Sequence, residues 1–488
     1  MTIIEQLDTI RIEASKNLDQ AKRSELGQFM TPTIVANFMA SLFLNTKSAV
    51  RILDPGAGIG SLAIALLDRI KTKNSTTDIS LTAYEIDQNL IVYLKQNLKT
   101  IRRSFEAENI NLNANIADKD FILEGNIINN EKYTHAILNP PYKKINSNSD
   151  HRLALRKIGQ EHVNLYSAFV AKSLELLEKK GQLVAIIPRS FCNGLYYKPF
   201  RRYILENAAI KHIHLFESRT HSFKDDNVLQ ENVIIHLQKG VNQKDVTISY
   251  SADRNLKVII KKTISFESVI KNNDSELFIH IPNITQTNLN TEDRICYTLE
   301  DIGLQVSTGP VVDFRVTGYL RMNPTKNSMP LIYATHFSGN GIEWPKVSKK
   351  PNALAINNTT LKASLPNGFY TVVKRFSSKE EKQRIVARVV KPQNFNSDVI
   401  GLENHLNYFH FMKQGINENL AFGLAAYLNT SYVDQHFRAF NGHTQVNATD
   451  LRQLKYPSRE TLIEIGKWAK YINIFTPENL DQRIMASL

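Results

Sequence analysis

Apolar runs alternate with amphipathic segments from Val50 to about Lys239, and this alternation limits the possible folds more than any other feature. The runs "VRILD", "ISLTAYEID", "THAILN", "QLVAIIP", "IKHIHLF" and "NVIIHLQ" predict strands, and segments 61–71, 88–103, 164–180 and 196–208 predict helices. Strands that alternate with helices predict right-handed crossovers and a mostly parallel, doubly wound α/β sheet. No strong helix separates the last two runs, so one of them is expected to be an antiparallel edge strand.

The chain has 488 residues, which is too long for one ordinary core, so we expect more than one domain. The strand and helix pattern occupies residues 1–245. Residues 246–300 mix short strand-like pieces with polar stretches and predict a connecting region. Residues 301–488 are irregular and rich in Asn, Lys, Thr and aromatic side chains, which favours a separate recognition module.

Positive charge points to a polyanionic partner. Lys and Arg number 60 against 47 Asp and Glu, a formal net charge of +13. Between Lys346 and Lys391 there are eleven Lys or Arg and two Glu. Nucleic acid is therefore the leading candidate partner. No apolar run is long enough to span a membrane and the N-terminal segment is polar, so we expect a cytoplasmic protein without a membrane partner.

The stretch "RILDPGAGIGSL" places Gly56, Gly58 and a third glycine between the first strand and a helix. Glycines there allow a sharp turn and close contact with a ligand. After the next strand, Glu85 can accept hydrogen bonds from a ribose diol. Asp54 would repel a pyrophosphate but suits the cationic amino group of S-adenosylmethionine, so the loop predicts a site for this cofactor rather than only a tight turn.

The stretch "AILNPPYKK" follows a buried strand with Asn139, Pro140 and Tyr142. Two prolines remove two backbone donors and force the chain to leave the sheet in a fixed extended shape. This rigidity is compatible with a plain turn, but it could also present Asn139 to a substrate. The cofactor loop at an earlier strand end favours the second interpretation.

The motifs "GQFMTP", "DPGAGIG", "YEID" and "NPPY" occur in this order and resemble the gamma class of DNA adenine-N6 methyltransferases, the modification enzymes of type II restriction systems. The resemblance is to the subgroup of the PstI and BsuBI methyltransferases. It covers roughly the first half of the chain, and "NGHTQVNATDLRQLKYP" is similar to the family's recognition region.

This resemblance implies a seven-stranded S-adenosylmethionine-dependent methyltransferase fold with a C-terminal mixed α/β DNA target-recognition domain. It also implies double-stranded DNA as the substrate, with CTGCAG as the suggested site. We expect a monomer, with a restriction endonuclease as a functional partner that forms no stable complex with it.

The resemblance assigns further residues to the cofactor. Thr31, which can also cap a helix beginning at Pro32, would contact the methionine end. Asp120 and Phe121 would hold the adenine of the cofactor, the first by a hydrogen bond and the second by packing. The interval before this pair is long, which leaves Asp118 as an alternative to Asp120.

The expected chemistry needs acceptors rather than a covalent nucleophile. An exocyclic adenine amine is a poor nucleophile because its lone pair is delocalised. The side-chain carbonyl of Asn139 and the backbone carbonyl of Pro140 could accept its two N–H bonds and localise that lone pair. Neither cysteine has the context of a methylating thiolate.

The target adenine must leave the base stack and be held by aromatic faces. Tyr142 is the expected platform for the flipped base. By resemblance Phe223 would supply the second face, and Phe216 and Phe191 are nearby alternatives. The histidines at 135, 151, 212 and 214 show no metal-ligand spacing, and we expect core or surface roles for them.

Two segments of the second half are expected to bind DNA, although each could be a solvated polar surface. Lys374 and Arg375 lie in the basic, partly apolar stretch "TVVKRFSSKEEKQRIVARVV". The loop "FNGHTQVNATDL" has a dense set of short hydrogen-bonding side chains, namely Asn441, His443, Thr444, Gln445 and Asn447. Thr449 and Asp450 predict a helix entry after this loop.

Two other functions remain open. An RNA base or a protein glutamine amide could also be methylated at an Asn-Pro-Pro-Tyr turn, although the large basic second half argues against the glutamine enzyme. The chain could also be a DNA-binding protein that keeps the fold without turnover. The intact Asp54, Glu85, Asn139 and Tyr142 argue against that.

Overall fold

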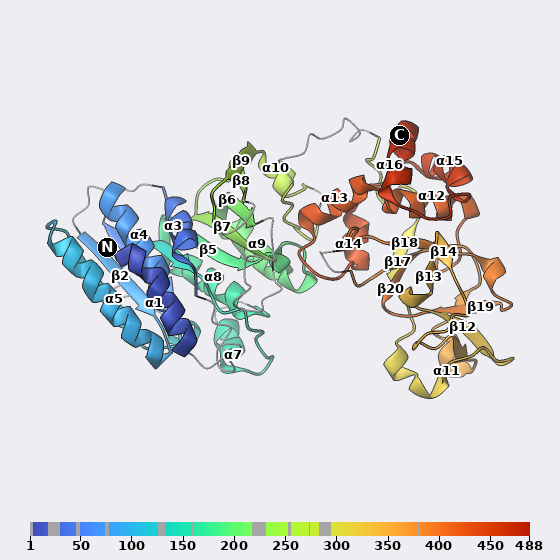
Figure 1. Cartoon of the computed structure of the whole chain (residues 1–488), viewed down its shortest axis with the longest axis horizontal. Coiled ribbons are helices and arrows are strands. Elements are labelled where there is room, and N and C mark those ends of the chain that lie inside the picture. Colours follow the sequence, from blue (N-terminus) through green and yellow to red (C-terminus); the bar gives the residue numbers. More distant parts are fainter. Residues whose placement is uncertain are drawn as a thin grey trace. The chain divides into compact units, whose positions relative to one another are not determined.

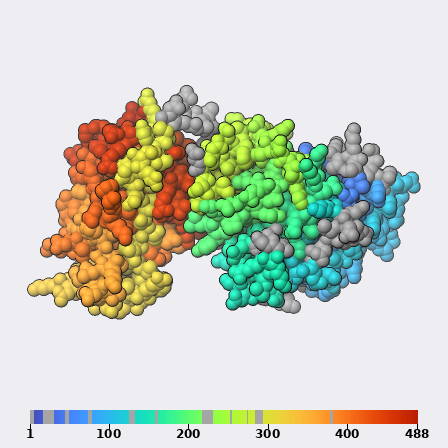
Figure 2. Space-filling view, turned by 180° about the vertical axis from the view of Figure 1, so that it is seen from behind, coloured from blue at the N-terminus to red at the C-terminus, as the bar shows by residue number. Residues whose placement is uncertain are grey.

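The chain folds into two compact units, a first unit of Met1–Thr285 and a second unit of Gln286–Leu488 (Figure 1). In the space-filling view, blue to light green marks the first unit and yellow to red marks the second (Figure 2). The computed structural model describes residues 3–17, 30–44, 49–73, 78–124, 132–157, 161–216, 231–251, 255–272, 274–282, 294–377 and 381–488.

The first unit is built on a nine-stranded sheet of order β3-β2-β1-β4-β5-β7-β6-β8-β9. Its strands are β1 (Val50–Pro55), β2 (Asp78–Tyr84), β3 (Asn111–Ala117), β4 (Tyr133–Leu138), β5 (Leu177–Pro188), β6 (Ala208–Phe216), β7 (Asn232–Lys239), β8 (Val246–Ser251) and β9 (Ile259–Ile264). Strands β1 to β5 are parallel. Together with β6 and β7 they form the predicted doubly wound sheet, which confirms the fold class.

The end of this sheet differs from the prediction in two ways. Strand β7 is antiparallel as expected, but it lies between β5 and β6 rather than at the edge, so both of its sides are hydrogen-bonded. The segment predicted to be a connecting region contributes two further strands, because β8 pairs with β6 and β9 pairs with β8. The outer strand β9 is mostly exposed and carries Lys261 and Lys262, which protects the sheet edge from further pairing.

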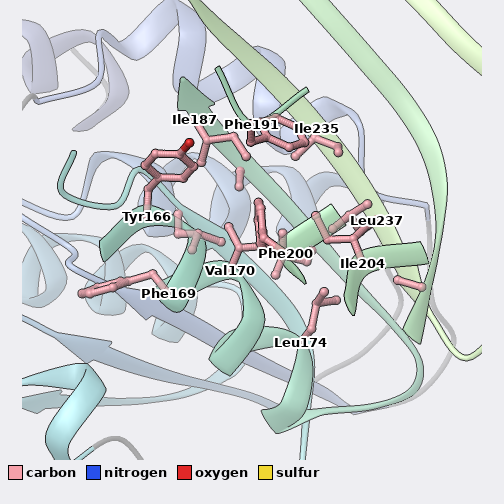
Figure 3. Close-up of a cluster of buried hydrophobic side chains, with 14 of the residues drawn as sticks. Tyr166, Phe169, Val170, Leu174, Ile187, Phe191, Phe200, Ile204, Ile235 and Leu237 are labelled. Carbon is pink, nitrogen blue, oxygen red and sulfur yellow. The ribbon is translucent and has the colours of Figure 1, made fainter. Parts of the chain in front are cut away.

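Helices cover both faces of this sheet. On one face α1 (Ile3–Asn17), α3 (Thr33–Ser41), α4 (Ser61–Lys73) and α5 (Gln88–Glu106) share a hydrophobic cluster with the strands. On the other face, side chains of α8 (Leu165–Leu176) and α9 (Lys198–Asn207) pack against Ile187 of β5 and against Ile235 and Leu237 of β7 (Figure 3). Three short helices add side chains to this second cluster: α6 (Phe121–Glu124), α7 (Asp150–Lys157) and α10 (Phe266–Val269).

The second unit is a mixed α/β structure. A four-stranded sheet has the order β10-β20-β17-β18, a five-stranded sheet has the order β11-β15-β12-β19-β16, and β13 pairs with β14. The bounds are β10 (Gln305–Thr308), β11 (Leu320–Arg321), β12 (Ser328–Ile332), β13 (Phe337–Ser338), β14 (Gly341–Ile342), β15 (Ala353–Ala355), β16 (Leu365–Pro366), β17 (Tyr370–Lys374), β18 (Ala387–Val390), β19 (Val399–Leu402) and β20 (Leu406–His410).

Helices of the second unit pack closely around this framework. They are α11 (Asn358–Leu361), α12 (Glu418–Leu428), α13 (Ser431–Phe440), α14 (Ala448–Gln453), α15 (Arg459–Ala469) and α16 (Pro477–Ser487). At Gly423 of α12 an added Cβ would lie 1.7 Å from the carbonyl oxygen of Leu462 in α15, so the two helices touch through bare backbone. In the described part of the chain, the helices are too short or too polar to cross a membrane.

Candidate active site and nucleic-acid interface

A cavity of about 300 Å³ in the first unit collects most of the predicted cofactor residues. It lies where parallel strands end, since the carboxyl ends of such strands meet at one edge of a sheet. Its wall includes Thr31, Gly56, Gly58, Glu85, Asp120, Phe121 and Asn139. These residues come from five separate stretches of sequence, so the fold places the predicted site in one location.

The glycine loop after β1 needs glycine for its backbone conformation. Gly56 and Gly58 have φ angles of +79° and +57°, in the left-handed region. The amides of Gly56 and Ala57 both donate to the carbonyl of Tyr84 at 2.8 Å, which holds the loop against β2. A Cβ added at Gly58 would meet no atom within 4 Å, so the loop leaves the space that a closely bound cofactor requires.

Glu85 follows β2 and is almost fully buried beside this loop. Its carboxylate accepts from the amide of Gly58 at 2.7 Å and from those of Ile86 and Asp87 at 2.9 Å each. Burial raises the pKa of Glu85, and the backbone hydrogen bonds oppose that shift. The carboxylate therefore sits rigidly on the cavity wall.

Asp54 lies beneath the glycine loop rather than on the cavity wall. Neither carboxylate oxygen has a hydrogen-bond partner among the residues that the structure describes. Burial raises its pKa to about 8, the nearby amide of Ala63 lowers it, and the charge of Glu85 raises it. Asp54 thus does not line the cavity, although it lies close enough to Glu85 for their charges to interact.

Of the two acids that the sequence left open, only Asp120 lines the cavity. One oxygen accepts from the amides of Ile122 and Leu123 at 2.8 and 3.0 Å, which caps α6. The other lies 2.9 Å from Nε2 of His151, so the predicted acceptor already has a partner. Asp118 is exposed and accepts from Gln88 outside the cavity wall.

His151 was expected to be a core or surface residue, but it lies on the cavity wall in contact with Asp120. Although burial raises the pKa of Asp120, the hydrogen bond from His151 lowers it overall, and the same bond raises the pKa of His151. No spacing in the sequence could have revealed this pair, because its members lie 31 residues apart on different elements.

Asn139 directly follows β4, and its amide is oriented from both ends. Its Nδ2 donates to Oγ1 of Thr31 at 3.0 Å, and its Oδ1 accepts from the hydroxyl of Tyr142 at 3.0 Å. The Tyr142 hydroxyl also lies 3.3 Å from the carbonyl oxygen of Ile186. Pro140 is buried next to Asn139. The NPPY turn and the "MTP" segment thus meet at the cavity.

The predicted helix cap at Thr31 is wrong. Helix α3 begins at Thr33 after Pro32, whose side chain provides no cap, and the carboxylate of Asp8 accepts from the amide of Thr33 at 3.1 Å. The hydroxyl of Thr31 contacts Asn139 instead.

The predicted second aromatic face, Phe223, lies outside the described residues. Of its two alternatives, Phe191 belongs to the hydrophobic cluster on the α8 and α9 face, where its ring lies 5.6 Å from that of Phe200. Phe216 belongs to the cluster on the α3 face. Asn139 is hydrogen-bonded to Thr31, just before α3, and so also lies on the α3 face. Phe216 and Asn139 therefore share one face of the sheet.

In the second unit, the two segments predicted to bind DNA lie side by side. The amide of Val446 donates to the carbonyl of Arg375 at 2.7 Å, and the amide of Ser377 donates to the carbonyl of Thr444 at 3.1 Å. Phe376 and Gln445 form the bridge between them. Thr444 is exposed, and the side chains of Lys374, Arg375, His443, Gln445 and Asn447 are half-buried.

Asn441 is the member of this set that the structure turns inward. It is 1% exposed, its Nδ2 donates to the carbonyl of Gln445 and to Asp450, and its Oδ1 accepts from Arg384. Asn441 therefore organises the loop from within instead of extending to a base. Helix α14 begins at Ala448, and Asp450 accepts from the amide of Asn447 at 2.9 Å, close to the predicted helix entry.

Arg384 is a functional candidate that sequence reasoning missed. It lies in the basic stretch that was expected to bind DNA, but it is 1% exposed. It donates to the carbonyl of His443 at 2.6 Å, to Asn441 at 3.1 Å and to Ser377 at 3.0 Å. A buried guanidinium thus fixes the loop to the basic strand end.

The glycine loop, the acid after β2 and the NPPY turn at the ends of a doubly wound sheet define the methyltransferase class of this fold. Residues 33–223 match the family model "Eco57I restriction-modification methylase". The structure is also similar to the type IIL restriction-modification enzyme MmeI, with a TM-score of 0.54 at 11% identity over 99% of this chain and 72% of that one.

Two relatives match nearly from end to end. The type II methyltransferase M.BsuBI of Bacillus subtilis is 50% identical over 96% of this chain and 94% of its own length. M.PstI of Providencia stuartii, also a type II methyltransferase, is 43% identical over 99% and 96%. The chain belongs to the type II restriction-modification methyltransferases, in the group of M.BsuBI and M.PstI. It is therefore a DNA methyltransferase, and this membership supports S-adenosylmethionine as its cofactor.

Proposed function

We propose that the protein is a site-specific DNA methyltransferase that transfers the methyl group of S-adenosylmethionine to N6 of an adenine flipped out of a short duplex site. In this role it protects DNA from a restriction endonuclease. The observation that carries the proposal is the doubly oriented amide of Asn139 on the cavity wall.

The residues that line the cavity have the chemical groups that this cofactor requires. It combines an open glycine loop, a buried carboxylate at Glu85 and an aromatic ring at Phe121. Glu85 would hold the ribose hydroxyls, Asp120 and Phe121 the adenine, and Thr31 the methionine end. Asp54 would act from beneath the loop. When bound, the cofactor supplies a methyl group on a positively charged sulfur, which is a strong electrophile.

The residues around Asn139 can prepare the amine for attack. Because Nδ2 donates to Thr31 and the Tyr142 hydroxyl donates to Oδ1, the carbonyl end of the amide is fixed. A carbonyl oxygen has two lone pairs, so Oδ1 can accept one N6–H bond while it keeps Tyr142. The carbonyl of Pro140 would accept the other, and the Tyr142 ring would stack on the base.

The second unit would select the site. Main-chain pairing joins the loop of His443, Thr444, Gln445 and Asn447 to the basic pair Lys374 and Arg375. The loop side chains would reach base edges, and the cations would contact phosphates and set the register. The proposed site, CTGCAG, is carried over from the family resemblance.

Labelled cofactor tests this function. Incubation with unmethylated duplex DNA, with RNA and with a protein substrate should label DNA alone, and nucleoside digestion should recover N6-methyladenine. Sequencing of DNA from expressing cells should then give the methylated site. Label in RNA or protein, or N4-methylcytosine in the digest, would refute the proposal.

A further inference from the structure

Asn232, the first residue of β7, has a buried side-chain amide with no role in the proposed function. Its side chain is 4% exposed. Neither Nδ2 nor Oδ1 has a hydrogen-bond partner among the residues described by the structure. Buried polar atoms are almost always bonded, so an amide with all its bonding positions open requires an explanation.

The sheet places Asn232 at the same edge as Asn139. Leu138 of β4 pairs with Ala185 of β5, and Pro188 of β5 pairs with Asn232. The two asparagines therefore flank the end of β5. Two interstrand spacings of about 4.8 Å and an offset of two residues separate their Cα atoms by on the order of 12 Å. A purine base fits between two side chains at this separation.

Both asparagines lie on one face of the sheet. Along β7, Ile235 and Leu237 point into the cluster of α8 and α9 (Figure 3), while Ile234 belongs to the cluster of α3 and α4. Side chains alternate along a strand, so Asn232 shares the face of Ile234. Asn139 contacts Thr31 just before α3 and thus lies on that face as well.

The neighbours of Asn232 hold its backbone in place and include an aromatic side chain. The amide of Arg189 donates to the carbonyl of Glu231 at 2.7 Å, and their side chains form an ion pair at 2.8 Å. These contacts fix the start of β7 to the end of β5. Leu215 pairs with Val233, which places Phe216 beside Asn232 on the α3 face.

We propose that Asn232 is a further substrate-binding residue, whose amide N–H donates to a ring nitrogen of the flipped adenine. The inference rests on the proposed function, in which Asn139 and Pro140 accept both hydrogens of the exocyclic amine. The ring nitrogens N1, N3 and N7 then remain as acceptors, of which N1 and N7 flank the amine, and a base outside the duplex needs new donors for them. Asn232 supplies such a donor at the required edge and face.

Asn232→Leu tests the contact, because leucine has a similar size and no polar atom. We expect kcat/KM for duplex DNA to fall roughly 10- to 100-fold, since one hydrogen bond to the base is lost. Cofactor affinity should stay unchanged. The thermal midpoint should not fall, because the substitution removes a buried amide without partners. Asn232→Ser, which keeps a shorter donor, should lie between the two.

Substrate analogues locate the contact. Duplexes with 1-deazaadenine or 7-deazaadenine at the target position each remove one ring acceptor. One of them should slow the wild-type protein, and that analogue should cause no further loss in Asn232→Leu. Ser173→Ala is the matched control, because this buried hydroxyl of α8 also lacks a partner in the described structure; its kcat/KM and analogue preference should equal those of the wild type.

The assignment would be overturned if Asn232→Leu had the same kcat/KM as the wild type. It would also be overturned if Asn232→Leu lost the same factor relative to the wild type on the parent duplex and on both analogue duplexes. A lowered thermal midpoint with unchanged analogue preference would show a purely structural residue. A wild-type protein that does not methylate adenine would refute the proposed function itself, so the two failures are distinguishable.

Discussion

Asparagines serve opposite purposes in the two units. In the first unit Asn139 stands at the end of a parallel strand on a cavity wall, and two contacts orient it toward that cavity. In the second unit Asn441 lies below the surface and bonds to Arg384, Asp450 and the backbone of its own loop. The first unit directs polar groups toward a cavity, whereas the second uses them to hold a surface loop in shape.

The largest expected difference between the two units is the loss of stability at acidic pH. Five buried histidines lie in the first unit: burial lowers the pKa to about 4 for His135, His162 and His212, and to about 3 for His214 and His236. In the second unit burial also lowers the pKa of His336 and His410. The first unit thus carries most of the shifted histidines in the described chain.

The sign follows from linkage. The histidine pKa values in the folded state lie below the unfolded value of about 6.5. Their effect on the free energy of unfolding is therefore small above pH 6.5, and this free energy declines as the pH falls from 6.5 toward the folded values. At pH 5.5 each histidine costs about 1 kcal/mol, and five together cost several kcal/mol. Asp54, whose folded pKa is raised to about 8, acts in the opposite direction over this range and offsets part of the loss. Both tryptophans, Trp344 and Trp468, are in the second unit, so their fluorescence reports its unfolding.

We therefore expect cofactor binding, a property of the first unit, to be lost at lower urea concentration than the tryptophan transition as the pH falls from 7.5 to 5.5. Coincident transitions at every pH would contradict this difference between the units.

Asn139→Ala should be the most damaging single substitution. Loss of a positioned acceptor typically costs roughly 10²- to 10³-fold in kcat. Binding of cofactor and of duplex DNA should remain within about twofold of the wild type, because in the proposed mechanism the reacting amine is the only substrate group that the side chain of Asn139 contacts. Single-turnover transfer and equilibrium binding measure these quantities separately. Asn115→Ala, at an exposed position of β3, is the control; near-normal transfer by Asn139→Ala would remove Asn139 from the mechanism.

Sequence reasoning predicted the first unit well because its central strands are buried on both faces and read as continuous apolar runs. It missed β3, whose polar stretch "NLNANIA" is only partly buried at the sheet edge, and it assigned β8 and β9 to a connecting region. His151, Asn232 and Arg384 share another reason. Each is defined by contacts or by a lack of partners that arise only in the folded chain, and no local periodicity records these.

Arg384→Met should affect the second unit alone. The change removes donors to His443, Asn441 and Ser377 from a buried site, so the free energy of unfolding of this unit should fall by about 2–3 kcal/mol. Discrimination between target and non-target duplexes should fall with it, while cofactor affinity in the first unit stays unchanged. Tryptophan-detected urea unfolding and competition binding measure both effects. Arg321→Met, at an exposed position, should change neither, and a similar loss there would show that the effect does not depend on burial.

Lys374→Gln should have the smallest effect and test the outer surface of the same region. Lys374 is half-buried and pairs with Glu381 at 3.2 Å, and a surface pair contributes at most about 1 kcal/mol. If Lys374 contacts a phosphate, its loss should weaken binding to target and non-target DNA equally and reduce the slope of log K against log salt by about 1. Glu381→Gln frees the lysine without changing its charge and should strengthen binding slightly. An unchanged salt slope in Lys374→Gln would show that Lys374 pairs with Glu381 and does not contact DNA. Other cations of this surface would then make the phosphate contacts.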